Sequence, residues 1–354
     1  MKAPARSALV VGGGVIGTTS AYRLARAGWT VTLIDPAPGA GASWAAAGMV
    51  APTAEIEPGE KENFTLQRHA LVAWRDLASE LETLTGDVVT LHETGTLLVG
   101  YDAGDRRLVE QFARVAASFG ATPRRVGRGD DGFRDVSARV TDGLVLDGDA
   151  WIDPDAAMSA LSHANEGLGV SVVRQRVLEA TTHGPEVALC TEDATYRGRV
   201  GVLATGASGP PPGLKNHAVH VVRPVRGMTV RLQGVDRSCQ PTLRAFVRGR
   251  PLYLVSRPGG YCILGASSEE KGELGIEVGE LQRLLRDALD LVPSLESATL
   301  LETRQGLRPA STDLRPFLER VEQRWIWAAG HYRHGVTLAP LAAADVLDFA
   351  EALA

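Results

Sequence analysis

The sequence is poor in cysteine and in aromatic residues. Its 354 residues include three cysteines, Cys190, Cys239 and Cys262, and aromatic side chains make up 5% of the total. Three widely spaced cysteines fit neither a disulfide framework nor the paired spacing of a Cys/His metal site. We therefore expect a reducing compartment and no bound metal.

The sequence also lacks a run of Lys and Arg and a long apolar segment. Its formal net charge is −5, whereas nucleic-acid-binding proteins carry a basic footprint. The first apolar run, residues 9–11, is too short for the core of a signal peptide or for a membrane span. These absences predict a cytoplasmic protein with small-molecule partners, bound to neither nucleic acid nor a membrane.

Basic residues gather only in short clusters. The clusters are Arg124, Arg125 and Arg128, and Arg244, Arg248 and Arg250. Short charge clusters usually belong to a solvated surface. We assign neither cluster a function.

What is present is an ordinary globular composition and a βαβ pattern. Hydrophobic residues make up 44% and charged residues 22%, and the length exceeds that of one ordinary single-core domain. Residues 7–11 and 30–34 have the pattern of strands, and residues 15–27 have helical spacing. A strand, a helix and a strand within about thirty residues predict a parallel sheet with right-handed crossovers.

The rest of the chain alternates between helical and strand patterns. Helical patterns cover residues 63–84, 105–119, 151–168, 279–291 and the segment after residue 335. Strand patterns cover residues 88–100, 170–173, 199–204, 219–232, 253–264 and 325–329. We expect the ranges 219–232 and 253–264 to form antiparallel strands of a second lobe.

These patterns predict an α/β fold of two interleaved parts. The first is a Rossmann-like domain, a parallel sheet with helices, formed by residues 1–85, 150–218 and 300–354. The second is a substrate-binding lobe with a mixed or antiparallel sheet, formed by residues 86–149 and 219–299. Because no low-complexity linker separates the parts, we expect no flexible tether between them.

Three glycines between the first strand and the first helix form a dinucleotide fingerprint. Gly12, Gly14 and Gly17 have the spacing G-x-G-x-x-G, which brings a pyrophosphate close to bare backbone and to the positive end of a helix. Asp35 follows the second strand and is positioned to bind an adenosine ribose. The alternative is a turn selected for tight packing alone. The fingerprint does not distinguish FAD from NAD.

Two further segments favour a flavin. Residues 43–49 are mostly small, so that main chain can lie against a planar ring system. The glycine turn at 330–335 leads into a helix and aims N–H groups and a positive dipole at one spot, where they would stabilise negative charge near N1 of a reduced flavin. The plainer interpretations are helix packing for the first segment and a strand-to-helix connection for the second.

Together, four motifs carry a family resemblance. The segments 10–17 (VVGGGVIG), 45–49 (AAAGM), 306–309 (GLRP) and 328–335 (AAGHYRHG) resemble those of the glycine oxidase branch of the D-amino-acid oxidase superfamily. The resemblance extends over essentially the whole chain. It implies an enzyme of the flavoprotein group associated with the thiazole of thiamine, which oxidises small amino acids or amines and passes the electrons to oxygen, giving hydrogen peroxide.

The resemblance also implies non-covalent FAD in extended form between the two lobes. Asp35 would hold the ribose, Val177 would meet the adenine, and residues 47–49 would line the isoalloxazine. The residues expected to bind the cofactor are Gly12, Gly14, Val15, Ile16, Gly17, Asp35, Pro36, Ala42, Ser43, Ala46, Ala47, Gly48, Met49, Val177, Gly206, His331, Tyr332, Arg333, His334, Gly335, Val336 and Thr337.

Two arginines are candidate catalytic residues. Arg308 and Arg333 lie next to glycine or proline in apolar surroundings, and a guanidinium fork binds a carboxylate through two parallel hydrogen bonds. The resemblance implies that Arg308 and Arg333 bind substrate and that Tyr253 adds a hydrogen bond. The alternative for each arginine is an ion pair with a buried acid such as Asp313, and the alternative for Tyr253 is a place in the core.

Departures from the family pattern leave the substrate open. His334, Tyr332 and the segment 248–251 differ from the expected residues, so a larger or more acidic amine, such as an N-carboxymethyl secondary amine, is an alternative to glycine. The sequence is also compatible with a quinone-linked D-amino-acid dehydrogenase, an NAD-dependent dehydrogenase and a flavin-binding redox sensor without turnover. A homo-oligomeric state stays open as well.

Overall fold

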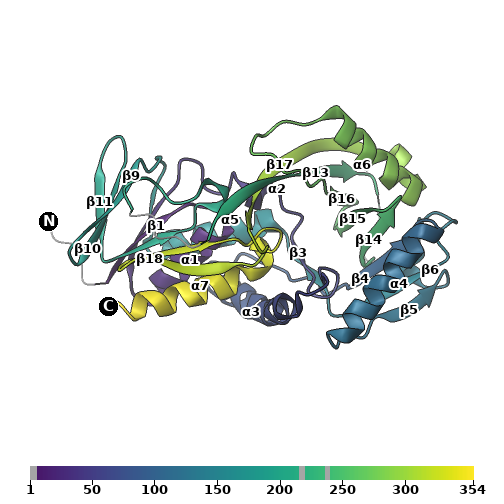
Figure 1. The fold of residues 1–354 in the computed structure, drawn as a ribbon, viewed down its shortest axis with the longest axis horizontal. Helices are drawn as coiled ribbons and strands as arrows, with labels where there is room; N and C mark the ends of the chain where they lie inside the picture. Colours follow the sequence, from purple (N-terminus) through teal and green to yellow (C-terminus); the bar gives the residue numbers. More distant parts are fainter. Residues whose placement is uncertain (1–5, 215–219, 236–239) are drawn as a thin grey trace.

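The computed structural model describes residues 6–214, 220–235 and 240–354 of the chain. Two large sheets lie at opposite ends of its longest axis (Figure 1). Val219, at the start of one predicted strand, and Cys239 lie outside the described residues, as does the predicted boundary between residues 218 and 219.

The first sheet has the parallel βαβ arrangement that the sequence predicts. Its strand order is β18-β19-β12-β1-β2-β8, and every neighbouring pair is parallel except β18 with β19. The strands are β1 (Ser7–Val11), β2 (Thr30–Ile34), β8 (Ser171–Val173), β12 (Val200–Leu203), β18 (Phe317–Glu322) and β19 (Trp325–Ala329). The patterns at 7–11, 30–34, 170–173, 199–204 and 325–329 are therefore confirmed as strands.

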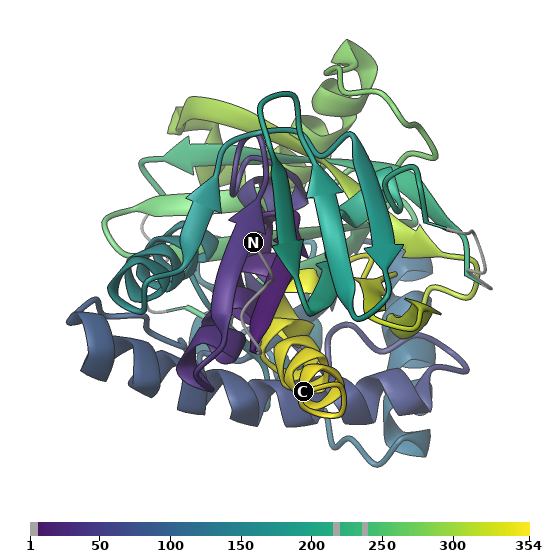
Figure 2. The same ribbon diagram turned by 90° about the vertical axis from the view of Figure 1, so that its left-hand side faces the viewer.

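The two faces of this sheet pack against different elements. Ala8 and Val10 of β1 pack in a cluster with side chains of the helices, whereas Leu9 and Val11 pack in a cluster with a small three-stranded sheet. Strand β1 is therefore buried on both faces, and its sequence is a nearly continuous run of apolar residues. This is typical of strands in parallel sheets. The helices are α1 (Val15–Arg26), α3 (Lys61–Thr85), α5 (Pro154–Gly167) and α7 (Gly335–Glu351). Figure 2 shows α3 and α7 below this sheet and the three-stranded sheet in front.

The three-stranded sheet was not predicted. It consists of β9 (Glu179–His183), β10 (Glu186–Cys190) and β11 (Thr195–Gly198), all antiparallel. Its strands are short and polar on one face, so their apolar residues are too few to form a clear alternating pattern. Its inner face packs through Val187 and Leu189.

The second sheet has eight strands, in the order β17-β13-β16-β15-β14-β4-β6-β5, and is mostly antiparallel. Only β14 and β4 pair in parallel. The strands are β4 (Thr96–Gly100), β5 (Arg124–Gly127), β6 (Asp142–Leu146), β13 (Val222–Gln233), β14 (Thr242–Val247), β15 (Arg250–Arg257), β16 (Tyr261–Gly265) and β17 (Thr299–Ser311). The expected antiparallel strands of a second lobe are confirmed in β13, β15 and β16.

The long strand β17 differs from the predicted division of the chain. It pairs with β13 from Val222↔Ser311 to Gln233↔Thr299, and both strands run from the middle of the molecule into the second sheet (Figure 1). The predicted division assigns residues from 300 onward to the first domain, although residues 300–311 are hydrogen-bonded within the second sheet. The rest of the division stays a prediction.

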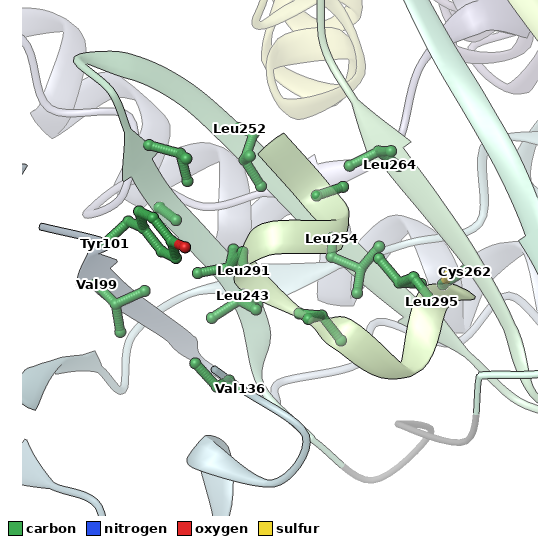
Figure 3. Close-up of a cluster of buried hydrophobic side chains, with 14 of the residues drawn as sticks. Val99, Tyr101, Val136, Leu243, Leu252, Leu254, Cys262, Leu264, Leu291 and Leu295 are labelled. Atoms are coloured by element: carbon green, nitrogen blue, oxygen red, sulfur yellow. The ribbon is translucent and has the colours of Figure 1, made fainter. Parts of the chain in front are cut away.

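One large apolar core stabilises the second sheet. Leu252, Leu254 and Leu264 point from β15 and β16 toward Leu291 and Leu295 (Figure 3). These last two lie in and after α6 (Val278–Leu291). A second helix, α4 (Ala103–Ser118), begins at a capping box formed by Asp102 and Asp105. The predicted helices at 105–119 and 279–291 are thus confirmed.

The remaining elements are short. They are α2 (Ala42–Ala45) and the pair β3 (Met49–Val50) and β7 (Ala150–Trp151), together with single 3-10 turns at Asp131–Phe133, Gly206–Ser208 and Pro293–Ser297. Within the described ranges, no helix has the length and apolar character needed to cross a membrane.

Candidate active site

A cavity of about 680 Å³ is lined by residues of both sheets. Its wall includes the β1–α1 turn, residues 34–37, 39–43, 45–49 and 204–212, parts of strands β13, β15 and β17, and residues 331–337. Sites for cofactors and small ligands are concave and often lie where two layers or domains meet. This cavity contains all three predicted catalytic residues and every predicted cofactor residue except Gly17.

In the glycine turn between β1 and α1, at one end of the cavity, the glycines have no side chains to cover the backbone. Gly12 has φ +102°, and a Cβ there would lie 2.3 Å from the Ala204 carbonyl oxygen. A Cβ on Gly17 would lie 1.9 Å from the Gly12 carbonyl oxygen. Gly17 therefore allows close packing behind the turn and does not line the cavity, whereas Gly12 and Gly14 do.

Two side chains hold this turn in place. The Asp35 carboxylate accepts hydrogen bonds from the N–H groups of Gly13 and Ala37, both at 2.7 Å. The Ser43 hydroxyl accepts one from the Val15 N–H at 2.9 Å. Since Gly14, the N-cap residue of α1, has no side chain, Ser43 satisfies one of the free donors of the first turn.

The segment 44–47, at the end of α2, contributes Ala45, Ala46 and Ala47 to the cavity wall and is held in place by the second sheet. Its carbonyl groups accept hydrogen bonds from three side chains of the second sheet. These are Arg304 to Trp44 at 3.1 Å, Thr229 to Ala45 at 3.0 Å and Arg257 to Ala47 at 2.6 Å. Main chain fixed in this way can support a planar ring without moving.

The C-terminal turn brings helix α7 to the cavity. Within the described residues, no side chain caps α7, so the first N–H groups of the helix have no partner within it. Gly335, Val336 and Thr337 line the cavity at this point. The Tyr332 N–H donates to the Pro309 carbonyl at 3.0 Å, which ties this turn to β17.

Two buried histidines flank this helix start. His331 and His334 are 4% and 3% exposed. Burial is the main cause that lowers the pKa of each imidazole to about 4. Both rings are therefore neutral near neutral pH, and they add no positive charge to the cavity.

Arg308 and Tyr253 lie together at the other end of the cavity. A Cβ on Gly227 would lie 2.2 Å from Arg308 Cζ, and a Cβ on Gly265 would lie 2.2 Å from Tyr253 Cζ, so each side chain rests on a glycine. Arg308 donates to the Ser267 carbonyl oxygen at 3.1 Å. Burial raises the pKa of the Tyr253 hydroxyl, which keeps it protonated as a hydrogen-bond donor.

Arg333 has acidic partners, one of the two arrangements expected for it from the sequence. Its Nη2 lies 3.2 Å from Glu57 Oε1, and its Nε lies 4.0 Å from Glu55 Oε2. Asp313, named as a candidate acid, instead accepts from Ser311 and from the backbone N–H of Arg315. The structure thus brings Arg333 into the cavity, but in ion pairs.

Sequence reasoning missed a second ion pair in the cavity, between Glu55 and Arg244. Arg244 Nη1 lies 2.5 Å from Glu55 Oε1, and the two side chains are 12% and 9% exposed. The interpretation of Arg244 as part of a solvated surface is therefore wrong. Arg244 pairs across the strands with Tyr253, but nothing in the sequence near Arg244 indicates a partner 189 positions away.

Several further lining residues carried no clear sequence signal. Thr205, Ser267 and Ser268 are small polar residues in loops, and Arg176 precedes the predicted adenine-binding Val177. Isolated residues of these types occur in most loops, so only the fold brings them to one cavity.

The residues present fit FAD. The glycine turn leaves room where a Cβ would clash, the start of α7 offers uncapped N–H groups, and the fixed wall at 44–47 is bordered by small residues. Val177 and Asp35 lie at the end expected for adenosine, and Arg308 and Tyr253 lie at the other end. An extended dinucleotide matches this order of groups.

Comparison with known proteins agrees with this fit. The model of the FAD dependent oxidoreductase family, DAO, matches residues 7–348. The glycine oxidase of Geobacillus kaustophilus is 28% identical over 351 residues, which are 97% of this chain and 92% of that protein. A crystal structure of glycine oxidase from the same bacterium has a TM-score of 0.86 at 25% identity and covers 98% of this chain and 94% of its own.

A bifunctional protein, ThiO/ThiG of Nostoc sp., is 31% identical over 360 residues, with 97% of this chain covered. The chain spans about half the length of that relative, 52%. With the family model matched over nearly its full length, this chain belongs to the FAD-dependent oxidoreductase family DAO and is an enzyme of the glycine oxidase and ThiO type.

Proposed function

We propose that this protein oxidises glycine, or a small amino acid or N-substituted glycine, to an imine that water converts to the 2-oxo acid. In the balanced reaction, the amino acid, oxygen and water give the 2-oxo acid, ammonia or an amine, and hydrogen peroxide. When bound, FAD supplies at N5 the acceptor for the hydride that leaves Cα. The names of the relatives and the resemblance to the thiamine-associated branch support this substrate class.

One observation carries the proposal. Among the described residues, no carboxylate is bonded to Arg308, which lies in the cavity beside the protonated Tyr253 hydroxyl. Arg308 is half-buried, and a guanidinium partly withdrawn from water without an acidic partner favours a ligand that supplies the negative charge. The carboxylate of an amino acid fits this need and would accept hydrogen bonds from both side chains.

Orientation is the main contribution of these residues. With its carboxylate held by Arg308 and Tyr253, a small amino acid has few ways to place its Cα–H bond toward the fixed wall at 44–47. Holding two reactants in one geometry can remove roughly 7–11 kcal/mol from a barrier. If the amine arrives uncharged, no side chain has to act as an acid or base in this step.

A test of the proposal is to remove the guanidinium while retaining the cofactor site. We expect Arg308→Ala to lower kcat/KM for glycine by about 100-fold, or about 3 kcal/mol, while FAD remains bound. The control is Arg320→Ala, on β18, whose guanidinium donates to the Gln323 carbonyl away from the cavity. Unchanged kcat and KM in Arg308→Ala would refute the proposed role.

Substrate and electron acceptor need a direct assay. The FAD-loaded protein is mixed with glycine, sarcosine, D-alanine and N-carboxymethyl amines, and oxygen uptake and hydrogen peroxide are measured. Reduction of the flavin without oxygen uptake would favour a quinone-linked dehydrogenase. Flavin binding without reduction by any amine would favour a redox sensor. A cytoplasmic location stays a prediction.

A further inference from the structure

Four charged side chains line the substrate end of the cavity, and a fifth, that of Glu57, pairs with one of them. Arg244, Arg308 and Arg333 are cations, and Glu55 and Glu57 are their acidic neighbours. Glu55 pairs with Arg244, and Glu57 with Arg333. Within the part of the chain that the structure describes, this leaves one guanidinium, that of Arg308, without a bonded acid.

Glu55 is the central acid of this group. It is 8% exposed and has its two oxygens near different guanidinium groups, Arg244 Nη1 at 2.5 Å and Arg333 Nε at 4.0 Å. Burial alone would raise the pKa of the Glu55 carboxyl, but Arg244 and Arg333 outweigh burial and hold the pKa at about 2. Glu55 is thus an anion at any pH at which an enzyme of this kind is assayed.

The backbone around Glu55 is fixed. The N–H groups of Thr53 and Ala54 donate to the Asp149 carboxylate at 2.8 and 3.1 Å. Asp149 is 1% exposed. Arg244 also donates to the Ala54 carbonyl oxygen. Glu55 therefore cannot easily swing away to make room for another anion.

We propose that Glu55 makes the site selective for amines that carry a single carboxylate, by occupying Arg244 and repelling a second anionic group. The inference rests on the proposed function, because it assumes that Arg308 binds the substrate carboxylate. A second carboxylate, as in an N-carboxymethyl amino acid or an acidic amino acid, meets the buried anion Glu55 and two guanidinium groups that already have partners. Like charges at a desolvated site are strongly unfavourable.

The test compares two unreactive ligands on the FAD-loaded protein. Glycolate carries one carboxylate, and oxydiacetate carries two in the arrangement of an N-carboxymethyl glycine. Each is titrated while the change in flavin absorbance is followed. We expect the wild type to bind glycolate at least about tenfold more tightly than oxydiacetate. Glu55→Gln should reduce this ratio by about tenfold, because the anion is removed and Arg244 loses its partner.

Matched variants distinguish the effect of the Glu55 charge on the affinity ratio from an effect of a disturbed fold. Glu93→Gln removes one negative charge from an exposed pair with Arg75, both side chains being nearly half exposed, and should leave the ratio unchanged. Arg244→Gln removes a cation beside Glu55 and should increase the ratio, opposite in direction to Glu55→Gln. If Glu55→Gln does not fold, the result for Arg244→Gln decides.

Two outcomes would overturn the inference. One is a wild type that binds oxydiacetate as tightly as glycolate, and the other is a ratio that neither Glu55→Gln nor Arg244→Gln changes. Failure of the proposed function looks different, because then the wild type oxidises no amine and glycolate does not perturb the flavin. If glycolate binds but neither variant changes the ratio of the two affinities, only the proposed role of Glu55 is rejected.

Discussion

At the scale of single residues, the substrate end of the site depends on two glycines. Gly227 and Gly265 carry no side chain where Arg308 and Tyr253 cross the sheet, and a Cβ at either position would lie 2.2 Å from the crossing side chain. Gly227 lies within β13, and Gly265 is the last residue of β16. A glycine inside a strand often marks such a close approach.

We predict that Gly227→Ala displaces Arg308 without unfolding the protein. The three atoms nearest to the new Cβ all belong to the guanidinium of Arg308, the end of a flexible side chain, so the strand can stay in place while the guanidinium moves. KM for glycine should rise about tenfold or more, since a shift of about 1 Å in a positioning group costs up to about 100-fold. Steady-state kinetics and a thermal melt measure the two effects.

The control for this change is Gly129→Ala. A Cβ at Gly129 would have no neighbour within 4 Å, so KM and melting temperature should both stay at the wild-type values. An unaltered KM in Gly227→Ala would mean that Arg308 either does not move or does not bind substrate.

The buried histidines predict a fall of stability in mild acid. In the folded protein the pKa values of His331 and His334 are about 4, whereas an unfolded histidine has a pKa of about 6.5. Between these values unfolding takes up protons, so the free energy of unfolding decreases as pH falls. The loss is about 1 kcal/mol for each histidine between about pH 6.5 and pH 5.5.

Denaturant unfolding at about pH 7 and about pH 5.5 measures this loss. In His334→Gln one of the two contributions is removed, so the difference between the two pH values should shrink by about 1 kcal/mol. Wild type and variant with the same pH dependence would contradict the assignment to His334.

At the scale of elements, the end of β15 holds the wall of the cofactor site. Arg257 is 3% exposed, and its guanidinium lies 3.9 Å from the centre of the Trp151 ring, which stacks on His92 at 3.7 Å. Its Nη2 donates to the carbonyls of Ala47 and Ile152. One strand of the second sheet thus fixes main chain of the first part of the chain.

We predict that Arg257→Met weakens FAD binding by about tenfold, because it leaves the Ala47 carbonyl without its donor and lets the wall move; a buried unsatisfied group costs about 1–3 kcal/mol. Titration of apoprotein with FAD, followed by flavin fluorescence, measures the effect. Arg304→Met is the comparison, since Arg304 holds the neighbouring Trp44 carbonyl from a more exposed position. Equal FAD affinity in Arg257→Met and wild type would exclude this role.

The elements that the sequence predicts are those with strong local patterns. The unit from β1 to β2 follows from apolar runs and a glycine turn, and α3, α4 and α6 follow from helical spacing. Strand β17 was missed because its first residues, from Thr299 to Arg304, are partly or fully exposed. Its pairing with β13 comes from residues distant in sequence, which no local pattern reveals.

The same limit applies to the site. The place of Arg308 and of residues 331–335 in the cavity could be predicted because they lie in motifs with a family resemblance, and that of Tyr253 because the same resemblance implies it. Glu55 and Arg244 could not, because their ion pair exists only once β14 lies beside the loop after β3. Local sequence describes such residues as surface charges, and only tertiary structure buries them.

At the scale of the whole molecule, residues of both sheets line the cavity. A bound cofactor should therefore stabilise the folded protein. Residues at the adenosine end of the cavity, such as Asp35 and Val177, belong to the first sheet and its loops, whereas Thr229, Tyr253 and Arg308 belong to the second. A ligand that binds only the folded state stabilises it by about 2.7 kcal/mol at 100 times its Kd. Removal of FAD should therefore lower Tm by a few degrees.

A fragment of the cofactor distinguishes the contribution of each sheet. ADP contains the adenosine and pyrophosphate but no flavin, so it can contact the glycine turn and Asp35 but not the residues of the second sheet. Each ligand is added at the same multiple of its own Kd. If the apoprotein unfolds in a single cooperative transition, FAD and ADP should then raise its Tm by the same amount. If the second sheet unfolds separately, only FAD should raise its transition, and ADP should leave that transition unchanged. Scanning calorimetry of the apoprotein with each ligand therefore measures whether the long strands β13 and β17 couple the two halves into one folding unit.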